Sequence, residues 1–116
     1  MKALLFFVGC LLLTSGSIAD AASPAGGVEA RQAPSCGEWI AHREKSDTLA
    51  LSNASWLLGY LSGLSTSSGK DYLSGTDNAS IYKWMDQYCR TNPLRDVSGG
   101  GDALAAELER KQGAPR

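Results

Sequence analysis

The stretch WMDQYCRTNP, residues 84–93, decides the fold because it completes the clearest helical pattern in the chain. Apolar side chains recur there at i, i+3, i+4, i+7 and i+8: Ile81, Trp84, Met85, Tyr88 and Cys89. That spacing predicts an amphipathic helix over residues 78–91. Thr76 or Asp77 caps its start. The Asn-Pro pair at 92–93 ends it, because a residue that precedes proline disfavours the helical conformation.

Cys89 lies near the end of this helix. A cysteine there can be a core residue, a nucleophile, a metal ligand or half of a disulfide. The start of the chain decides between these roles. Met1 and Lys2 are followed by the apolar run 3–13 and then by the small and polar stretch TSGSIADAAS, which is the layout of a secretory signal peptide. We predict cleavage after Ala21, so residues 1–21 are the signal peptide and the mature protein is secreted or periplasmic. The apolar run is about half the length that a membrane-spanning helix needs.

The cysteine inventory follows from this compartment. Cys10 lies in the signal peptide, and the leucines at 11–13 do not fit a lipoprotein signal. Its removal leaves Cys36 and Cys89, and two cysteines outside the cytosol most simply form one disulfide. Closing the loop between them stabilises the fold by about 4 kcal/mol on the chain-entropy estimate. A domain this small benefits from such a staple, because its core is marginal by itself.

Two more helices are predicted before residue 66. Ser35 and Glu38 have the spacing of a capping box, which starts a helix over residues 36–46. The next helix runs from after Asp47 to about Ser65. Its apolar stripe consists of Ala54, Leu57, Leu58, Leu61 and Leu64, flanked by Trp56 and Tyr60.

The opposite face of the second helix is unusual for a surface helix. It carries only small side chains, and no charged residue occurs between Asp47 and Lys70. Because a solvated helix face usually carries charge, we expect this face to be enclosed by other helices or covered by a second protein molecule. Its small residues are Ser52, Ser55, Gly59, Ser62 and Gly63.

The rest of the chain completes an all-α, four-helix, disulfide-stapled domain over residues 35–112. Turn-forming residues predict a loop over 66–77, with Tyr72 and Leu73 tucked back onto the helices. After a short turn at 94–98, the glycines at 99–101 predict a break, and a last helix follows from about 102 to 111. Residues 22–34 and 113–116 are predicted to be disordered.

Catalytic and metal chemistry are excluded mainly by the residue inventory. The chain has one histidine, His42, so no metal site can be assembled around it and no cofactor is expected. A nucleophilic pair of Cys89 and His42 would need a reduced thiol in an oxidising compartment. The carboxylates, including Asp86 and Glu107, occupy separate contexts and are interpreted as surface acids. We therefore expect no enzyme.

Charge and short motifs exclude further classes of partner. The chain has 11 basic and 12 acidic residues without a basic run or an acidic tail, so neither nucleic acid nor a membrane surface is expected as a partner. Asn53 and Asn78 begin glycosylation sequons, but matches this short arise by chance and matter only in a eukaryotic secretory pathway.

One family combines these features. Cys36, the central apolar helix, the WMDQYCRTNP stretch and the last leucine-spaced helix resemble the HdeA/HdeB periplasmic acid-stress chaperones over about residues 35–111. The resemblance implies an HdeA-like bundle that forms a homodimer near neutral pH. It also implies that acid releases an apolar surface, which holds unfolded periplasmic proteins and prevents their aggregation.

A second resemblance leads to a different partner. Gly59-Tyr60-Leu61-Ser62-Gly63, followed later by a helix that ends in Asn-Pro, is similar to the secreted Tai-type immunity proteins. It implies binding to one specific effector protein, a type VI secretion amidase. Those proteins commonly carry a second cysteine pair near the Gly-Tyr-x-x-Gly segment, where this chain has Leu57 and Leu58.

Charge supports the first of these two functions. Loss of Lys2 and Asp20 with the signal peptide leaves 10 basic and 11 acidic residues, so the charges nearly cancel at neutral pH. At about pH 2 the carboxylates are protonated, and the net charge rises to roughly +12 when His42 and the amino terminus are included. The positive charges then repel one another, while the disulfide keeps the chain from opening fully. The surface predicted to be released or shared consists of Trp56, Leu57, Tyr60, Leu61 and Leu64.

Overall fold

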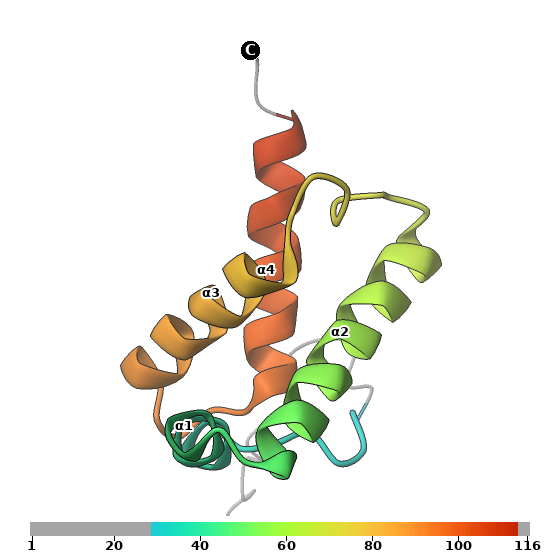
Figure 1. The fold of residues 1–116 in the computed structure, drawn as a ribbon. Helices are drawn as coiled ribbons and strands as arrows, with labels where there is room; N and C mark the ends of the chain where they lie inside the picture. The colour runs from blue at the N-terminus through green and yellow to red at the C-terminus, as the bar shows by residue number, and fades with distance from the viewer. Residues whose placement is uncertain (1–28, 114–116) are drawn as a thin grey trace, which may run out of the picture.

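Four helices, joined by short connections, make up the computed structural model, which describes residues 29–113. They are α1 (Cys36–Lys45), α2 (Thr48–Ser68), α3 (Asn78–Thr91) and α4 (Val97–Gly113), as Figure 1 shows. Within residues 29–113 the only β pairing is an isolated bridge between Ser35 and Asp96. The predicted all-α, disulfide-stapled four-helix fold is confirmed. The predicted signal peptide lies outside the described residues, as do 22–28 and 114–116.

Side-chain caps set where the first three helices begin. The predicted capping box at α1 is present: the Glu38 amide donates to Ser35 Oγ over 3.1 Å, and the Ser35 amide donates to Glu38 Oε2 over 2.8 Å. Asp47 caps α2 by accepting from the Ala50 amide, and Asp77 caps α3 by accepting from the Ser80 amide. These bonds satisfy donors that a helix start leaves unpaired, which is why each helix begins there.

The end of α2 lies three residues beyond its predicted end at Ser65. Its last turn is rich in serine, and the hydroxyls of Ser67 and Ser68 donate back to carbonyls of the same helix. The helix stops at Gly69, whose φ of 68° is left-handed and suits a residue without Cβ. In the following loop Tyr72 is buried and Leu73 packs against the core, so the predicted tuck of these two residues is confirmed.

The predicted break in the last helix is wrong, because α4 runs without interruption through Ser98 and the three glycines after it. Close packing explains those glycines. A Cβ on Gly100 would lie 2.5 Å from Met85 Sδ, and a Cβ on Gly101 would lie 2.7 Å from Tyr60 Cδ1. The glycines therefore let α4 approach α3 and α2 more closely than alanine would, which offsets their poor helix propensity.

The core lies between α4 and the helices beside it. In Figure 1, α4 stands in the middle of the bundle, α3 crosses it on one side and α2 flanks it on the other. α1 packs against α3 and α2. The largest fully buried side chains come from all four helices: Trp39, Leu57, Leu61, Met85, Val97, Cys36 and Cys89.

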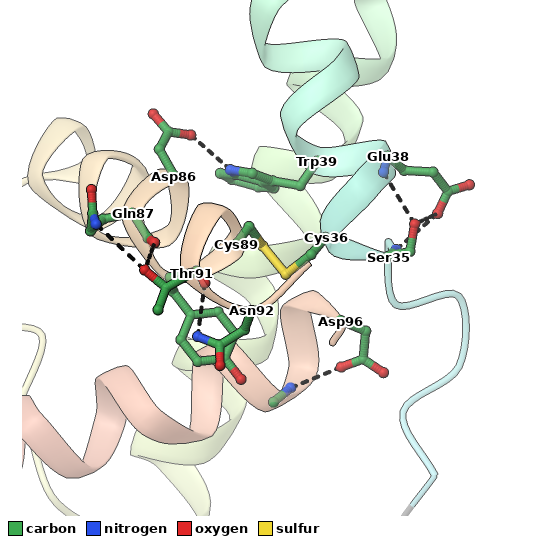
Figure 2. Close-up of a disulfide and its surroundings, with 12 residues drawn as sticks. Ser35, Cys36, Glu38, Trp39, Asp86, Gln87, Cys89, Thr91, Asn92 and Asp96 are labelled. Carbon is green, nitrogen blue, oxygen red and sulfur yellow. Dashed lines mark hydrogen bonds between the residues drawn. A yellow bond between two sulfur atoms is a disulfide. The ribbon is translucent and has the colours of Figure 1, made fainter. Parts of the chain in front are cut away.

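The helix ends meet at the disulfide. Cys36 at the start of α1 is bonded to Cys89 near the end of α3, with 4.8 Å between their Cα atoms, as predicted from the sequence (Figure 2). The Cys36 amide also donates to the carbonyl of Arg95, and the Val97 amide donates to the carbonyl of Pro34, each over 2.9 Å. The starts of α1 and α4 and the end of α3 are thereby held together.

Residues 29–34 follow a defined path in the structure, although the sequence assigns them to a disordered segment. We call them the N-terminal strap. Pro34 is buried, and its carbonyl bonds to α4. Farther out, the carbonyl of Arg31 accepts a hydrogen bond from Trp56 Nε1 on α2, over 3.1 Å. The strap therefore lies against α2 before it enters α1.

Candidate functional site

The five residues predicted to bind protein fall into two sets. Leu57 and Leu61 are 0% exposed and belong to the core. Trp56, Tyr60 and Leu64 are half-buried and lie along one edge of α2. In the folded protein only the second set can contact a partner. Leu57 and Leu61 become available only if α2 separates from the other helices.

The half-buried edge of α2 forms one wall of a groove of ≈ 450 Å³, which we call the α2 groove. Its lining residues are Ala30, Arg31, Trp56, Tyr60, Leu64 and Ser67. The rings of Trp56 and Tyr60 are stacked, with centroids 5.1 Å apart and planes inclined by 12°. Residues four apart lie one above the other on a helix, which is why these rings stack. The strap supplies the other wall.

The small-residue face of α2 is open within the described residues. Gly59 and Gly63 are exposed, and a Cβ on either would meet no atom within 4 Å. Leu51, on the same helix, is 72% exposed. The expectation that this face is enclosed by the protein's own helices is therefore wrong, because α1, α3 and α4 all lie on the other side of α2. Cover by a second protein molecule stays a prediction.

A carboxylate lies at the contact between α1 and α3. Asp86 on α3 accepts from Trp39 Nε1 over 2.7 Å and from Arg43 Nε and Nη2 over 2.9 Å each, and Figure 2 shows the bond to Trp39. Arg43 also lies over the rings of Trp39 and Tyr82. Partial burial alone would raise the pKa of Asp86, but the hydrogen bonds from Arg43 and Trp39 outweigh it and lower that pKa below its ordinary value.

A second carboxylate joins α3 to α4. Glu107 on α4 accepts from Trp84 Nε1 over 2.8 Å and forms an ion pair with Lys111 over 2.9 Å. These two donors lower the pKa of Glu107, with Lys111 the larger influence. Trp84 in turn stacks on Tyr88 of the same helix, with 5.5 Å between ring centroids.

The two remaining helix contacts also contain a carboxylate. Tyr60 on α2 donates its hydroxyl to Asp102 on α4 over 2.7 Å, and burial together with this bond raises the pKa of Tyr60. At the corner between α1 and α2, His42 Nδ1 lies 2.9 Å from Asp47 Oδ2. The bond to His42 is the main cause of a lowered pKa at Asp47. Each of the four principal helix–helix contacts therefore has an acidic side chain bonded across it or at its corner.

Residues suited to catalysis or metal binding are not brought together in residues 29–113. No group of three histidine, cysteine or acidic side chains in this range is close enough to hold a metal ion. Cys36 and Cys89 line a second groove, of ≈ 360 Å³, but each is only 1% exposed. Cys89 is committed to the disulfide, which excludes the nucleophilic role in this oxidised state.

Sequence reasoning missed the bonded carboxylates because it treated Asp86 and Glu107 as isolated surface acids. Trp39 and Arg43 are four residues apart, so a shared acceptor for their donors could be expected on a neighbouring helix. Which carboxylate accepts depends on how α1 crosses α3. That crossing is a tertiary property without a local signal in the sequence.

In the described part of the chain, no helix combines the length and the apolar character needed to cross a membrane. Comparison of the chain with protein-family models, with curated proteins and with solved structures gave no significant match.

Proposed function

We propose that this protein is a secreted or periplasmic, non-catalytic holdase that acid activates to bind unfolded proteins and prevent their aggregation. The observation that carries the proposal is the set of three aromatic donors bonded to carboxylates across helix contacts: Trp39 to Asp86, Tyr60 to Asp102 and Trp84 to Glu107. In each pair the acceptor is an acidic side chain, and the pKa values of Asp86 and Glu107 are lowered in the folded protein. In each pair the donor is a large, partly apolar side chain.

Protonation of the carboxylates with lowered pKa values weakens their contacts together. Asp86, Glu107 and Asp47 have lowered pKa values in the folded protein, so each stabilises the fold above its ordinary pKa near 4, and that stabilisation is lost as the pH falls through the lowered value. The same holds for Asp77 at the start of α3 and Asp96 at the start of α4. Several helix contacts and helix caps therefore weaken within one acidic pH range.

The charge on the chain changes in the same range. The formal net charge of the whole chain is −1 at pH 7, with 11 basic and 12 acidic residues. Once the carboxylates are neutral, only positive charges remain, and they repel one another across a small domain. The disulfide does not titrate and continues to connect α1 to α3. We expect a loosened, cross-linked chain that exposes Leu57 and Leu61 next to Trp56, Tyr60 and Leu64.

A client-aggregation assay tests this function. The protein is mixed with an unrelated, acid-sensitive protein, and light scattering is followed at pH 7 and at about pH 2.5. The proposal expects suppression of aggregation only at the acidic pH. Equal suppression at both pH values, or none at the acidic pH, contradicts it.

A second function, that of an immunity protein for a secreted amidase effector, is favoured by the open face of α2. Gly59 and Gly63 leave open space on an uncharged face of α2, which another protein could approach closely at neutral pH. The test is titration of a candidate effector at pH 7 with the wild type and with a Gly59→Leu variant. Tight binding by the wild type that the added side chain abolishes would support this function over the first.

A further inference from the structure

The α2 groove is partly occupied by the chain itself. The N-terminal strap lies across one end of it, where Ala30 and Arg31 face Trp56 and Tyr60. One hydrogen bond holds the strap there, from the indole N–H of Trp56 to the carbonyl of Arg31. The acceptor is a main-chain atom, so any peptide segment with a free carbonyl could take its place.

The strap is weakly attached at this point. The side chains of Arg31 and Glu29 form an ion pair, but they are 83% and 73% exposed, and such a surface pair contributes little to stability. Gln32 has a φ of 57°, which is an unfavourable region for a residue with a Cβ. The turn that brings the strap onto Trp56 therefore requires Gln32 to adopt an unfavourable backbone conformation.

The chemistry of the groove specifies an uncharged occupant. Among its lining residues only Arg31, which belongs to the strap, carries a charge, and α2 has no charged residue between Asp47 and Lys70. The stacked rings of Trp56 and Tyr60 form an apolar ridge along one wall of the groove, and Leu64 extends it by one turn. An aromatic ridge with an indole donor matches the way aromatic-lined grooves bind extended, proline-containing segments.

We propose that the α2 groove is a docking site for an extended, uncharged peptide segment of another protein, and that the N-terminal strap competes for one end of it. The peptide carbonyl accepts from Trp56 Nε1 in place of Arg31, and its small apolar side chains lie on the rings of Trp56 and Tyr60. The groove exists in the folded protein, so this binding takes place at neutral pH and does not depend on acid activation.

The three tryptophan indoles provide the test. Trp39 and Trp84 donate to carboxylates, and Trp56 donates to the strap, so nitrogen-15 NMR of the full chain at pH 7 has one reporter in the groove and two controls. The indole signal that disappears in Trp56→Phe is assigned to Trp56. The probe is an uncharged decapeptide of alternating alanine and proline with blocked ends. We expect it to shift the Trp56 signal in a saturable way and to leave the other two unmoved.

Two matched comparisons make the test sharper. Ala30→Lys places a charge on the strap where it lines the groove and adds no acceptor for the indole. It should lower the Kd of the peptide about fivefold, the factor expected when a competing contact as strong as one hydrogen bond is lost. Ala79→Lys, the same change at an exposed position on α3, should leave the Kd unchanged. A decapeptide with glutamate in place of alanine should not bind.

Four results would overturn the inference: no shift of the Trp56 signal in either wild type or Ala30→Lys, shifts of all three indole signals together, equal Kd values for wild type and Ala30→Lys, or equal binding of the glutamate peptide. A Trp56 signal that moves with protein concentration before peptide is added would assign the groove to a second copy of this chain and overturn it as well. None of these outcomes bears on aggregation at acidic pH, so the holdase proposal is tested separately.

Discussion

Trp39 on α1 and Asp86 on α3 are joined by a hydrogen bond of 2.7 Å, and the same carboxylate holds Arg43 with two further bonds. This one acidic side chain thus anchors three donors of α1 onto α3. A buried indole needs an acceptor, and here the acceptor is a group that acid can neutralise. The fold is therefore stabilised at neutral pH by a contact whose strength depends on pH.

Replacing Asp86 by asparagine keeps the shape of the side chain and removes its charge. We expect Asp86→Asn to lower the free energy of unfolding at pH 7 by about 1.5–3 kcal/mol, the value of hydrogen bonds to a charged group. Because the pKa of Asp86 is lowered in the folded protein, the difference from wild type should shrink as the pH falls below the ordinary aspartate pKa near 4. Urea unfolding at pH 7 and at about pH 3.5, where a folded population remains, measures both quantities.

The control for this change is Asp71→Asn. Asp71 is exposed in the loop after α2, so the variant should stay within about 0.5 kcal/mol of wild type. An Asp86→Asn variant that loses as much stability at about pH 3.5 as at pH 7 would show that its effect does not come from the charge.

The glycines of α4 and α2 should respond to alanine with opposite signs. A Cβ on Gly100 would lie 2.5 Å from Sδ of Met85, which is 0% exposed and has little room to move. We expect Gly100→Ala to destabilise the fold by about 1–3 kcal/mol through overpacking. At Gly59 the added methyl group meets open space, and Gly59→Ala should stabilise the fold by up to about 1 kcal/mol. Thermal unfolding of both variants measures the change in Tm relative to wild type. Shifts of the two Tm values in the same direction would contradict this prediction.

Much of this fold could be predicted from the sequence, because its helices are marked locally. The capping box at Ser35 and Glu38 and the Asn-Pro pair after α3 gave helix boundaries that the structure confirms. The glycines of α4 misled the same reasoning. A glycine lowers helix propensity wherever it stands, but whether packing compensates for it depends on Met85 and Tyr60 from other helices. The candidate site was predicted only in part for the same reason, since the burial of Leu57 and Leu61 depends on tertiary packing.

The disulfide should account for a large part of the stability of this domain. It closes a loop of 53 residues, and the double variant Cys36→Ser, Cys89→Ser should lose about 4 kcal/mol. Chemical unfolding of the oxidised wild type and of the double variant compares the two. Before that comparison, the intact mass of the exported protein should lack two hydrogens relative to the reduced chain. A mass that corresponds to two free thiols would contradict the staple.

The most direct test of whether acid loosens the bundle and exposes its apolar side chains is a pH titration. It follows near-ultraviolet and far-ultraviolet circular dichroism together with binding of an apolar dye. If protonation of the interhelical carboxylates loosens the bundle, the near-ultraviolet signal of the packed tryptophans disappears between about pH 4 and pH 2, while helix content largely remains and dye binding rises. Asp86→Asn should begin this transition at a higher pH than wild type. A near-ultraviolet signal that stays native down to pH 2, without dye binding, would contradict the proposed mechanism.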